Sequence, residues 1–296
     1  MVDGGIVSSE APRHRRGLLV FARAQPLGAV ALAVILVMLL AGVFAGIVAP
    51  YDPLTIDFGA VLAPPSAAHP FGADSFGRDI LSRIIFGART ALVVGFTASL
   101  LGSAAGALIG IASAFHGGRV DLAVQRIIDV LLAFPVIVLA IVVAAMLGRH
   151  LVLGIDGALV LAIAVPIAPQ VARVIRAATL PIRGAAYIDA ARIAGLGNGR
   201  IILFHILPNV MAPLLIMLTA FIGQAILLES SLSFLGLGVS EPTPAWGLML
   251  AGTAITFYRE APWLILFPGA AISLAVFAFN FLGDALRDWL DPRLRR

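Results

Sequence analysis

Residues able to carry out catalysis are few and scattered in this chain. No H-E-x-x-H pair occurs and there is no cysteine, which argues against zinc and thiolate metal sites. All 20 basic residues are arginine. Because a phosphate-binding P-loop needs a lysine, any ATP hydrolysis linked to this chain must take place on another chain. The histidines lie in separate segments, as His14, His69, His116, His150 and His205.

No pair of carboxylates is placed for catalysis either. An intramembrane aspartyl protease needs two aspartates that face each other within the membrane. Asp284 lies at the end of an apolar run, with no second aspartate at its level. We therefore expect no catalytic residue, no metal ligand and no cofactor in this chain.

Glu229 is the ionisable residue best placed to act inside a membrane, because it lies within an apolar run. A charged group at the bilayer centre costs about 2.5 kcal/mol or more, so it faces a polar cavity or a partner helix by default. We expect Glu229, with Gln224 and Asn280, to line a translocation path or gate. The alternatives are a carboxylate that reaches the headgroups or pairs with an arginine of a partner, and helix–helix hydrogen bonds for the two amides.

The composition is that of a membrane protein. Hydrophobic residues make up 60% of the 296 residues and charged residues 12%, against about 45–50% and about 25% in soluble domains. The net charge of +4 could indicate nucleic acid. The arginines are spread between apolar runs instead of forming one patch, so we expect a membrane lipid surface and no nucleic acid as partner.

The apolar runs predict an all-α protein with six transmembrane helices, because about 20 apolar residues cross a bilayer. The fifth run is short, but Arg173 and Arg176 can snorkel from its end. Pro208 suits the first turn of the sixth helix. The expected spans are 27–48, 90–115, 130–148, 157–172, 209–228 and 261–283.

Most arginines lie in segments that an even number of predicted spans separates from the N-terminus. These segments therefore lie on the same side of the membrane as the N-terminus. The positive-inside rule therefore puts both termini and the 179–208 loop in the cytoplasm. The run 27–48 exceeds the length of a signal-peptide core, and we expect an uncleaved anchor. The expected organisation is a cytoplasmic tail (1–26), the anchor helix (27–48), an extracytoplasmic loop (49–89), a five-helix core (90–284) and a cytoplasmic tail (285–296).

Two outer segments carry further signals. Residues 79–89 place Ile80 and Ile84 on one face, which predicts a short amphipathic helix on the outer interface. In the loop 236–262 and directly after it, Trp246, Tyr258 and Trp263 are expected to anchor helix ends in the headgroups.

Within the spans, prolines and glycines have different expected roles. Prolines interrupt spans and free backbone groups that neighbouring helices must satisfy. Small residues spaced by three or more positions predict close helix packing in the second span. The prolines are Pro135, Pro166, Pro169 and Pro213, and the glycines are Gly95, Gly102, Gly106 and Gly110.

The polar segment 179–208 lies between two apolar runs. Residues 186–194 are good helix formers, and Gly195 can take the left-handed conformation that ends a helix. Gly197, Asn198 and Gly199 are expected to turn the chain back. The small side chains of Ala186, Ala190, Ala191 and Ala194 would let another surface approach closely; the alternative is a solvated connecting loop.

This segment resembles the EAA loop of permease subunits in ATP-binding-cassette importers. Asp189-Ala190-Ala191 stands for Glu-Ala-Ala, Gly195 follows, and Leu207-Pro208 closes the motif. Ala186 stands where an acidic residue is common, and His205 where isoleucine is usual. Further segments look like the C-type permease of dipeptide and oligopeptide importers, namely 69–83, 117–121, 129–135, 233–238, 242–247 and 280–284.

The resemblance implies a type I importer permease fold in a bacterial inner membrane. Expected partners are a homologous B-type permease, two ATPase subunits that carry ATP and Mg, and an extracytoplasmic binding protein. The coupling residues that it implies are Tyr187, Asp189, Ala190, Ala191, Gly195, Leu207 and Pro208.

The function expected on this basis is that of a permease subunit for peptides, working by alternating access. One alternative is a secondary transporter coupled to protons through Glu229. Others are the same permease role for nickel, haem or another solute, and a structural membrane scaffold.

Overall fold

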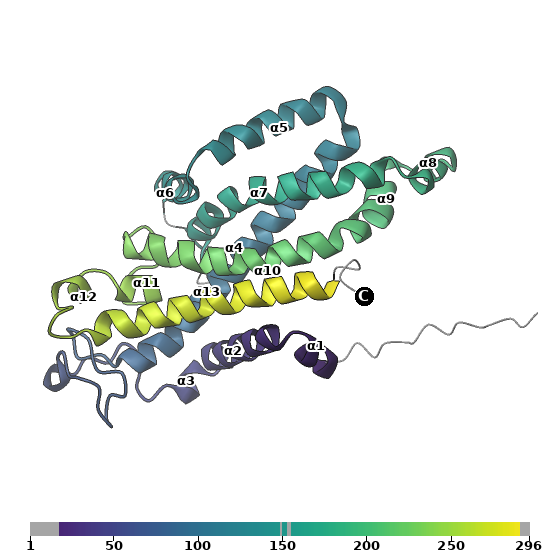
Figure 1. Cartoon of the computed structure of the whole chain (residues 1–296). Coiled ribbons are helices and arrows are strands. Elements are labelled where there is room, and N and C mark those ends of the chain that lie inside the picture. The colour runs from purple at the N-terminus through teal and green to yellow at the C-terminus, as the bar shows by residue number, and fades with distance from the viewer. Residues whose placement is uncertain (1–17, 149, 153–154, 291–296) are drawn as a thin grey trace, which may run out of the picture.

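A computed structural model describes residues 18–148, 150–152 and 155–290. Parts of the two predicted tails therefore lie outside the described residues. Arg149 of an expected outer loop also lies outside them. The described chain is almost entirely helical, as predicted, and its long helices lie side by side along one axis (Figure 1).

The helices follow one another in chain order. The first half contains α1 (Leu18–Ala24), α2 (Pro26–Val43), α3 (Ala45–Val48), the 3-10 helix η1 (Phe58–Ala60), α4 (Ile80–His116), α5 (Gly118–Ala133) and α6 (Val136–Leu147). The second half contains α7 (Gly157–Arg183), α8 (Ala186–Ile193), α9 (Asn198–Ile201), the π-helical turn η2 (Ile202–Ile206), α10 (Leu207–Phe234), α11 (Trp246–Met249), α12 (Thr253–Thr256) and α13 (Trp263–Leu290). Between α6 and α7, β1 (Leu151–Val152) and β2 (Ile155–Asp156) pair antiparallel, with Leu151 opposite Asp156.

Five helical segments of the described chain are long and apolar enough to cross a membrane. They are Pro26–Val43, Ile80–His116, Gly157–Arg183, Asn198–Phe234 and Trp263–Trp289. A sixth crossing arises if α5 and α6 are taken as one broken span.

The third span, predicted over 130–148 with an interruption at Pro135, consists of the end of α5 and of α6. The chain bends by 96° between α5 and α6. The break falls at Phe134 and Pro135, because proline has no backbone N–H and disfavours helical conformation in the residue before it. Pro166 and Pro169 lie inside α7, and Pro213 lies inside α10. Only Pro135 among these four prolines separates two helices.

The short interfacial helix predicted over 79–89 is instead the beginning of α4. Asp79 caps this helix, since its carboxylate accepts from the Ser82 backbone N–H at 2.8 Å. With 37 residues, α4 is roughly 55 Å long at 1.5 Å per residue, well beyond the ~30 Å of a hydrocarbon core. Its first turns extend the span, and Ile80 and Arg83 are each only 1% exposed.

Glycines hold α4 against its neighbours, as the spacing predicted. A Cβ on Gly106 would lie 2.5 Å from the Ala168 carbonyl oxygen, and one on Gly110 would lie 2.5 Å from that of Ala172. Gly102 meets α7 in the same way. Gly95 faces Ile226 of α10 instead. Helices α4 and α7 therefore touch through their backbones, which fixes the centre of the bundle.

Arginines predicted to snorkel from α7 are paired with acidic residues of α5. The Arg176 guanidinium donates to both carboxylate oxygens of Asp121, at 2.7 and 2.6 Å. Arg173 pairs with Asp129. These contacts attach the amphipathic helix α5 to α7.

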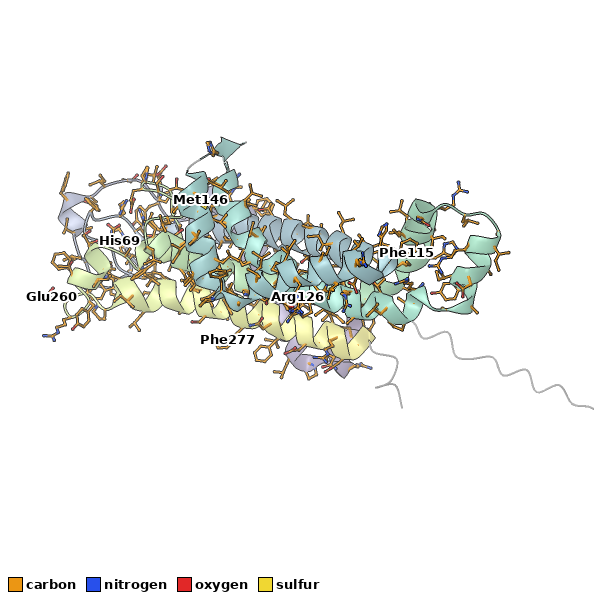
Figure 2. All side chains as sticks on the ribbon, turned by 90° about the horizontal axis from the view of Figure 1, so that it is seen from above. His69, Phe115, Arg126, Met146, Glu260 and Phe277 are labelled. Carbon is orange, nitrogen blue, oxygen red and sulfur yellow. The ribbon has the colours of Figure 1, made fainter. Side chains whose placement is uncertain are left out.

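The bundle has two distinct ends. One end, here called the α8 end, holds α8, α9 and both ends of the described chain, where the Phe21 and Trp289 rings meet at 5.6 Å (Figure 1). The other, the loop end, holds residues 49–79 and 236–262. His69 and Glu260 lie at the loop end and Phe115 lies at the α8 end (Figure 2).

Trp246 at the loop end is buried, contrary to the prediction of a headgroup anchor. Its side chain is 2% exposed, and its indole N–H donates to the Ile84 carbonyl at 2.9 Å. The ring fits against Gly87, where a Cβ would lie 2.7 Å from it. Tyr258 does remain half-exposed.

Candidate functional site

The segment between α7 and α10 forms a short helix held out at the α8 end (Figure 1). The helix α8 spans Ala186–Ile193, close to the predicted 186–194. Gly195 follows with φ +81°, the left-handed conformation predicted for the helix end. The connection is more helical than expected, since α7 continues to Arg183 and the next helix begins at Asn198.

One face of α8 packs on the body of the protein. Ile188 is fully buried and Ala191 is 8% exposed, and both belong to the main hydrophobic core with Ile201 and Ile206. Ala191 was expected among the small side chains offered to a partner. The structure places it on the opposite face, where its small size allows α8 to lie close to the core.

The outer face of α8 is apolar and exposed. Ile193 is 88% exposed and Tyr187 is 46% exposed. Ala186, Ala190 and Ala194 are exposed beside them. The sequence did not single out Ile193, because its pattern does not show which face of this helix is buried. With Ile188 and Ala191 facing inward, Ile193 points away from them.

The charged residues of α8 form a local ion pair. Arg192 donates to the Asp189 carboxylate at 3.0 Å, and the two side chains are 40% and 60% exposed. The Arg192 guanidinium also lies 5.6 Å from the centre of the Phe115 ring, near the end of α4. An exposed pair of this kind contributes a few tenths of a kcal/mol, so Asp189 remains available to a partner.

A second link joins the end of α7 to the end of α4. Arg183 donates to the Ala114 carbonyl at 2.9 Å. Gly117, with φ +65°, leaves room for this guanidinium, because a Cβ there would lie 2.3 Å from Arg183 Nη1. The ends of α4 and α7 are therefore held together just before α8 begins.

The closing part of the motif lies in a continuous helix. Pro208 lies in the first turn of α10, as predicted, and α9 and the π-helical turn extend the membrane-crossing segment back to Asn198. The π-helical turn Ile202–Ile206 directly precedes α10, and such a turn relieves the clash of proline with the preceding carbonyls. Leu207 is partly buried against the core, whereas Pro208 is exposed.

The residues predicted for the translocation path are not brought into one group by the contacts of the described chain. Glu229 is fully buried, and its carboxylate accepts from the Ser233 hydroxyl at 2.7 Å and the Ser230 hydroxyl at 3.3 Å. Snorkelling of Glu229 to the headgroups is thereby excluded. Gln224 is partly buried in α10. Asn280 is exposed on α13, with its side-chain oxygen 3.3 Å from the position of a Cβ on Gly223.

Within residues 18–148, 150–152 and 155–290, no group of three His, Asp or Glu side chains could hold a metal ion. The expectation of no metal and no cofactor remains a prediction for the whole chain.

Comparisons with known proteins agree on one family. Its sequence profile, described as binding-protein-dependent transport system inner membrane component, matches residues 102–296. The dipeptide transport system permease protein of Alkalihalophilus pseudofirmus is 45% identical over 234 residues, which covers 79% of this chain and 75% of that protein. The glutathione transport system permease protein of Escherichia coli is 40% identical over 274 residues, covering 92% and 88%.

A solved structure shows the same fold. The MetNI methionine ABC transporter, in inward-facing conformations, matches with a TM-score of 0.54 at 18% identity, covering 70% of this chain and 96% of that chain. The family profile covers more than half of this sequence, and the relatives cover most of it. The chain belongs to the family of binding-protein-dependent transport system inner membrane components.

Proposed function

We propose that this chain is the permease subunit of an ATP-driven importer for short peptides, and that the exposed face of α8 docks on an ATPase subunit. The observation that carries the proposal is α8 itself, a helix with an exposed apolar face that is anchored to the core through its other face. Relatives named for dipeptide and glutathione transport, at 45% and 40% identity, support the peptide class of cargo.

The proposed partners follow from the absence of lysine and from the exposed face of α8. It has no lysine for a P-loop, so ATP and Mg belong to two ATPase subunits on other chains. A homologous B-type permease supplies the other half of the path, and an extracytoplasmic binding protein delivers the peptide. The α8 end and both termini face the cytoplasm of a bacterial inner membrane.

Each residue of the docking helix then has a distinct role. Tyr187, Ala190 and Ile193 present the contact surface, and Asp189 offers its carboxylate to the ATPase. Ala191 and Leu207 hold the helix to the core, while Gly195 ends it. Movement of the ATPases passes through Arg192 and Arg183 to α4 and α7, which alternates the access of the path.

Ile193→Asp tests the docking face. A carboxylate on this apolar surface removes buried contact with the partner and leaves the fold intact, because Ile193 is 88% exposed. The complex is purified from the native membrane, and the co-purified ATPase and ATP-dependent peptide uptake in proteoliposomes are measured. We expect both to be lost.

The matched control is Ile56→Asp at the loop end, where Ile56 is 52% exposed. It should retain the ATPase and uptake. Wild-type uptake that requires a proton gradient and proceeds without ATP would support the secondary transporter and overturn the proposal.

A further inference from the structure

A cavity of about 250 Å³ opens at the loop end, away from α8. It lies between the first turn of α4, the preceding segment 72–79 and the short helices α11 and α12. Its polar lining comes from Asp74, Arg78, Arg83, Glu241 and Thr253, and its apolar wall includes Leu248.

Arg83 is the unusual member of this lining. Its side chain is 1% exposed, yet its Nη1 has no hydrogen-bond partner among the described residues. Arg83 Nε lies 3.9 Å from the Asp74 carboxylate and Nη2 lies 3.6 Å from that of Glu241. Both distances are too long for hydrogen bonds. A buried guanidinium with unused donors is costly unless an acceptor enters the cavity.

The neighbouring charges are already satisfied by one another. Asp74 accepts from the backbone N–H groups of Phe76 and Arg78, and from Arg78 Nε at 2.7 Å. Arg78 also donates to Glu241 at 3.0 Å. The two arginines and two carboxylates balance in charge, so the unmet requirement at Arg83 is for acceptor oxygens.

A carboxylate is the group that best matches a guanidinium, because two oxygens can accept from two N–H groups in one plane. Glu241 has a half-exposed side chain and accepts from Arg78 through Oε2 alone, so its Oε1 can meet a positively charged group that remains nearer to solvent. Leu248, Met249 and Leu264 give the cavity an apolar side. Together these features fit a small zwitterion with an apolar side chain.

We propose that this cavity binds the free carboxyl terminus of a short peptide through Arg83, at the outer mouth of the permease. The inference rests on the proposed function, which supplies the peptide class and the outward orientation of the loop end. It assigns a binding role to the segment 74–83, which the docking site at α8 leaves unexplained.

The experiment uses the complex of both permeases and the ATPases in lipid nanodiscs, without the binding protein. Binding of L-alanyl-L-alanine and of its C-terminal amide is measured by saturation-transfer NMR, which detects weak ligands. The free acid should bind roughly tenfold or more tightly than the amide, as expected for loss of a charged hydrogen-bonded pair.

Variants assign the effect to Arg83. Arg83→Gln should abolish the preference for the free acid, and Arg83→Lys should reduce it, because lysine keeps the charge but not the planar pair of donors. Arg89→Gln, at an exposed arginine of the same helix outside the cavity, should behave as wild type. If the complex with Arg83→Gln fails to assemble, the binding of acid and amide to the wild-type complex still tests the inference.

Equal binding of acid and amide to the wild-type complex would overturn the inference. So would a complex that ignores both peptides but binds the purified binding protein through Arg83, since the cavity would then accept an acidic side chain of that protein. The proposed function is tested separately, by ATP-dependent peptide uptake with the binding protein present. Normal uptake by a complex that shows no preference for the free carboxylate would support the proposed function and refute only the role of the cavity.

Discussion

At the scale of single residues, Glu229 and its serines show how a carboxylate is kept inside the bundle. Ser233 donates its hydroxyl to Glu229, and the same oxygen accepts from the Val239 backbone N–H at 3.1 Å. One serine therefore connects a buried acid in α10 to the chain that leaves this helix. The glycines of the next segment add to this packing, since a Cβ on Gly247 would lie 2.0 Å from the Ser230 carbonyl.

Ser233→Ala should destabilise the protein by about 1–3 kcal/mol, because it leaves the buried Glu229 carboxylate and the partly buried Val239 N–H without this partner. Thermal unfolding of the purified protein measures the change. Ser231→Ala is the matched control, since the exposed Ser231 hydroxyl bonds only to the Leu227 carbonyl of its own helix. Equal unfolding temperatures for the two variants would contradict a structural role for Ser233.

Gly195 offers a second test at this scale. No atom lies within 4 Å of a Cβ added at Gly195 or Gly197, so space alone does not distinguish them. Only Gly195 has a positive φ, which costs other residues about 1–2 kcal/mol. Gly195→Val should therefore distort the end of α8 and lower ATP-dependent uptake, with membrane insertion unchanged. Gly197→Val should transport normally; a similar loss in both would mean that side-chain bulk, and not the helix end, matters.

At the scale of the elements, the sequence predicted well where the signal is local. The helix α8 was predicted because its helix formers stop at a glycine, and the close packing of α4 because small residues recur along it. The interruption at Pro135 was predicted but its 96° angle was not, since proline alone does not say whether a helix kinks or ends. The burial of Arg83 was not predictable, because Glu241 and Thr253 reach it from more than 150 positions away.

Gly106→Ala tests the contact between α4 and α7. The added methyl would lie 2.5 Å from a backbone oxygen, so the helices must separate, at a cost of about 1–3 kcal/mol. Gly269→Ala in α13 is the control, because a Cβ there meets nothing within 4 Å. We expect a lower unfolding temperature only for Gly106→Ala. If Gly106→Ala unfolds at the wild-type temperature, the backbone contact between these helices is not as close as described.

At the scale of the whole molecule, the two ends of the bundle present different surfaces. The α8 end presents an apolar helix face, and the loop end presents a charged cavity. Helix α4 spans the distance between them, because its first turn lines the cavity and its last turn carries Phe115 at the α8 end. Arg192 joins α8 to α4 through the Phe115 ring, and Arg183 joins the end of α7 to the same end of α4.

Contact between α8 and an ATPase is the central claim, and crosslinking tests it most directly. The chain has no cysteine, so Ile193→Cys and Ile56→Cys each carry a single photoreactive thiol label in the native membrane. Mass spectrometry identifies what each label captures. We predict that the label at residue 193 captures an ATPase subunit and that the label at residue 56 does not. Failure to capture an ATPase from residue 193, or equal capture from residue 56, would contradict the claim.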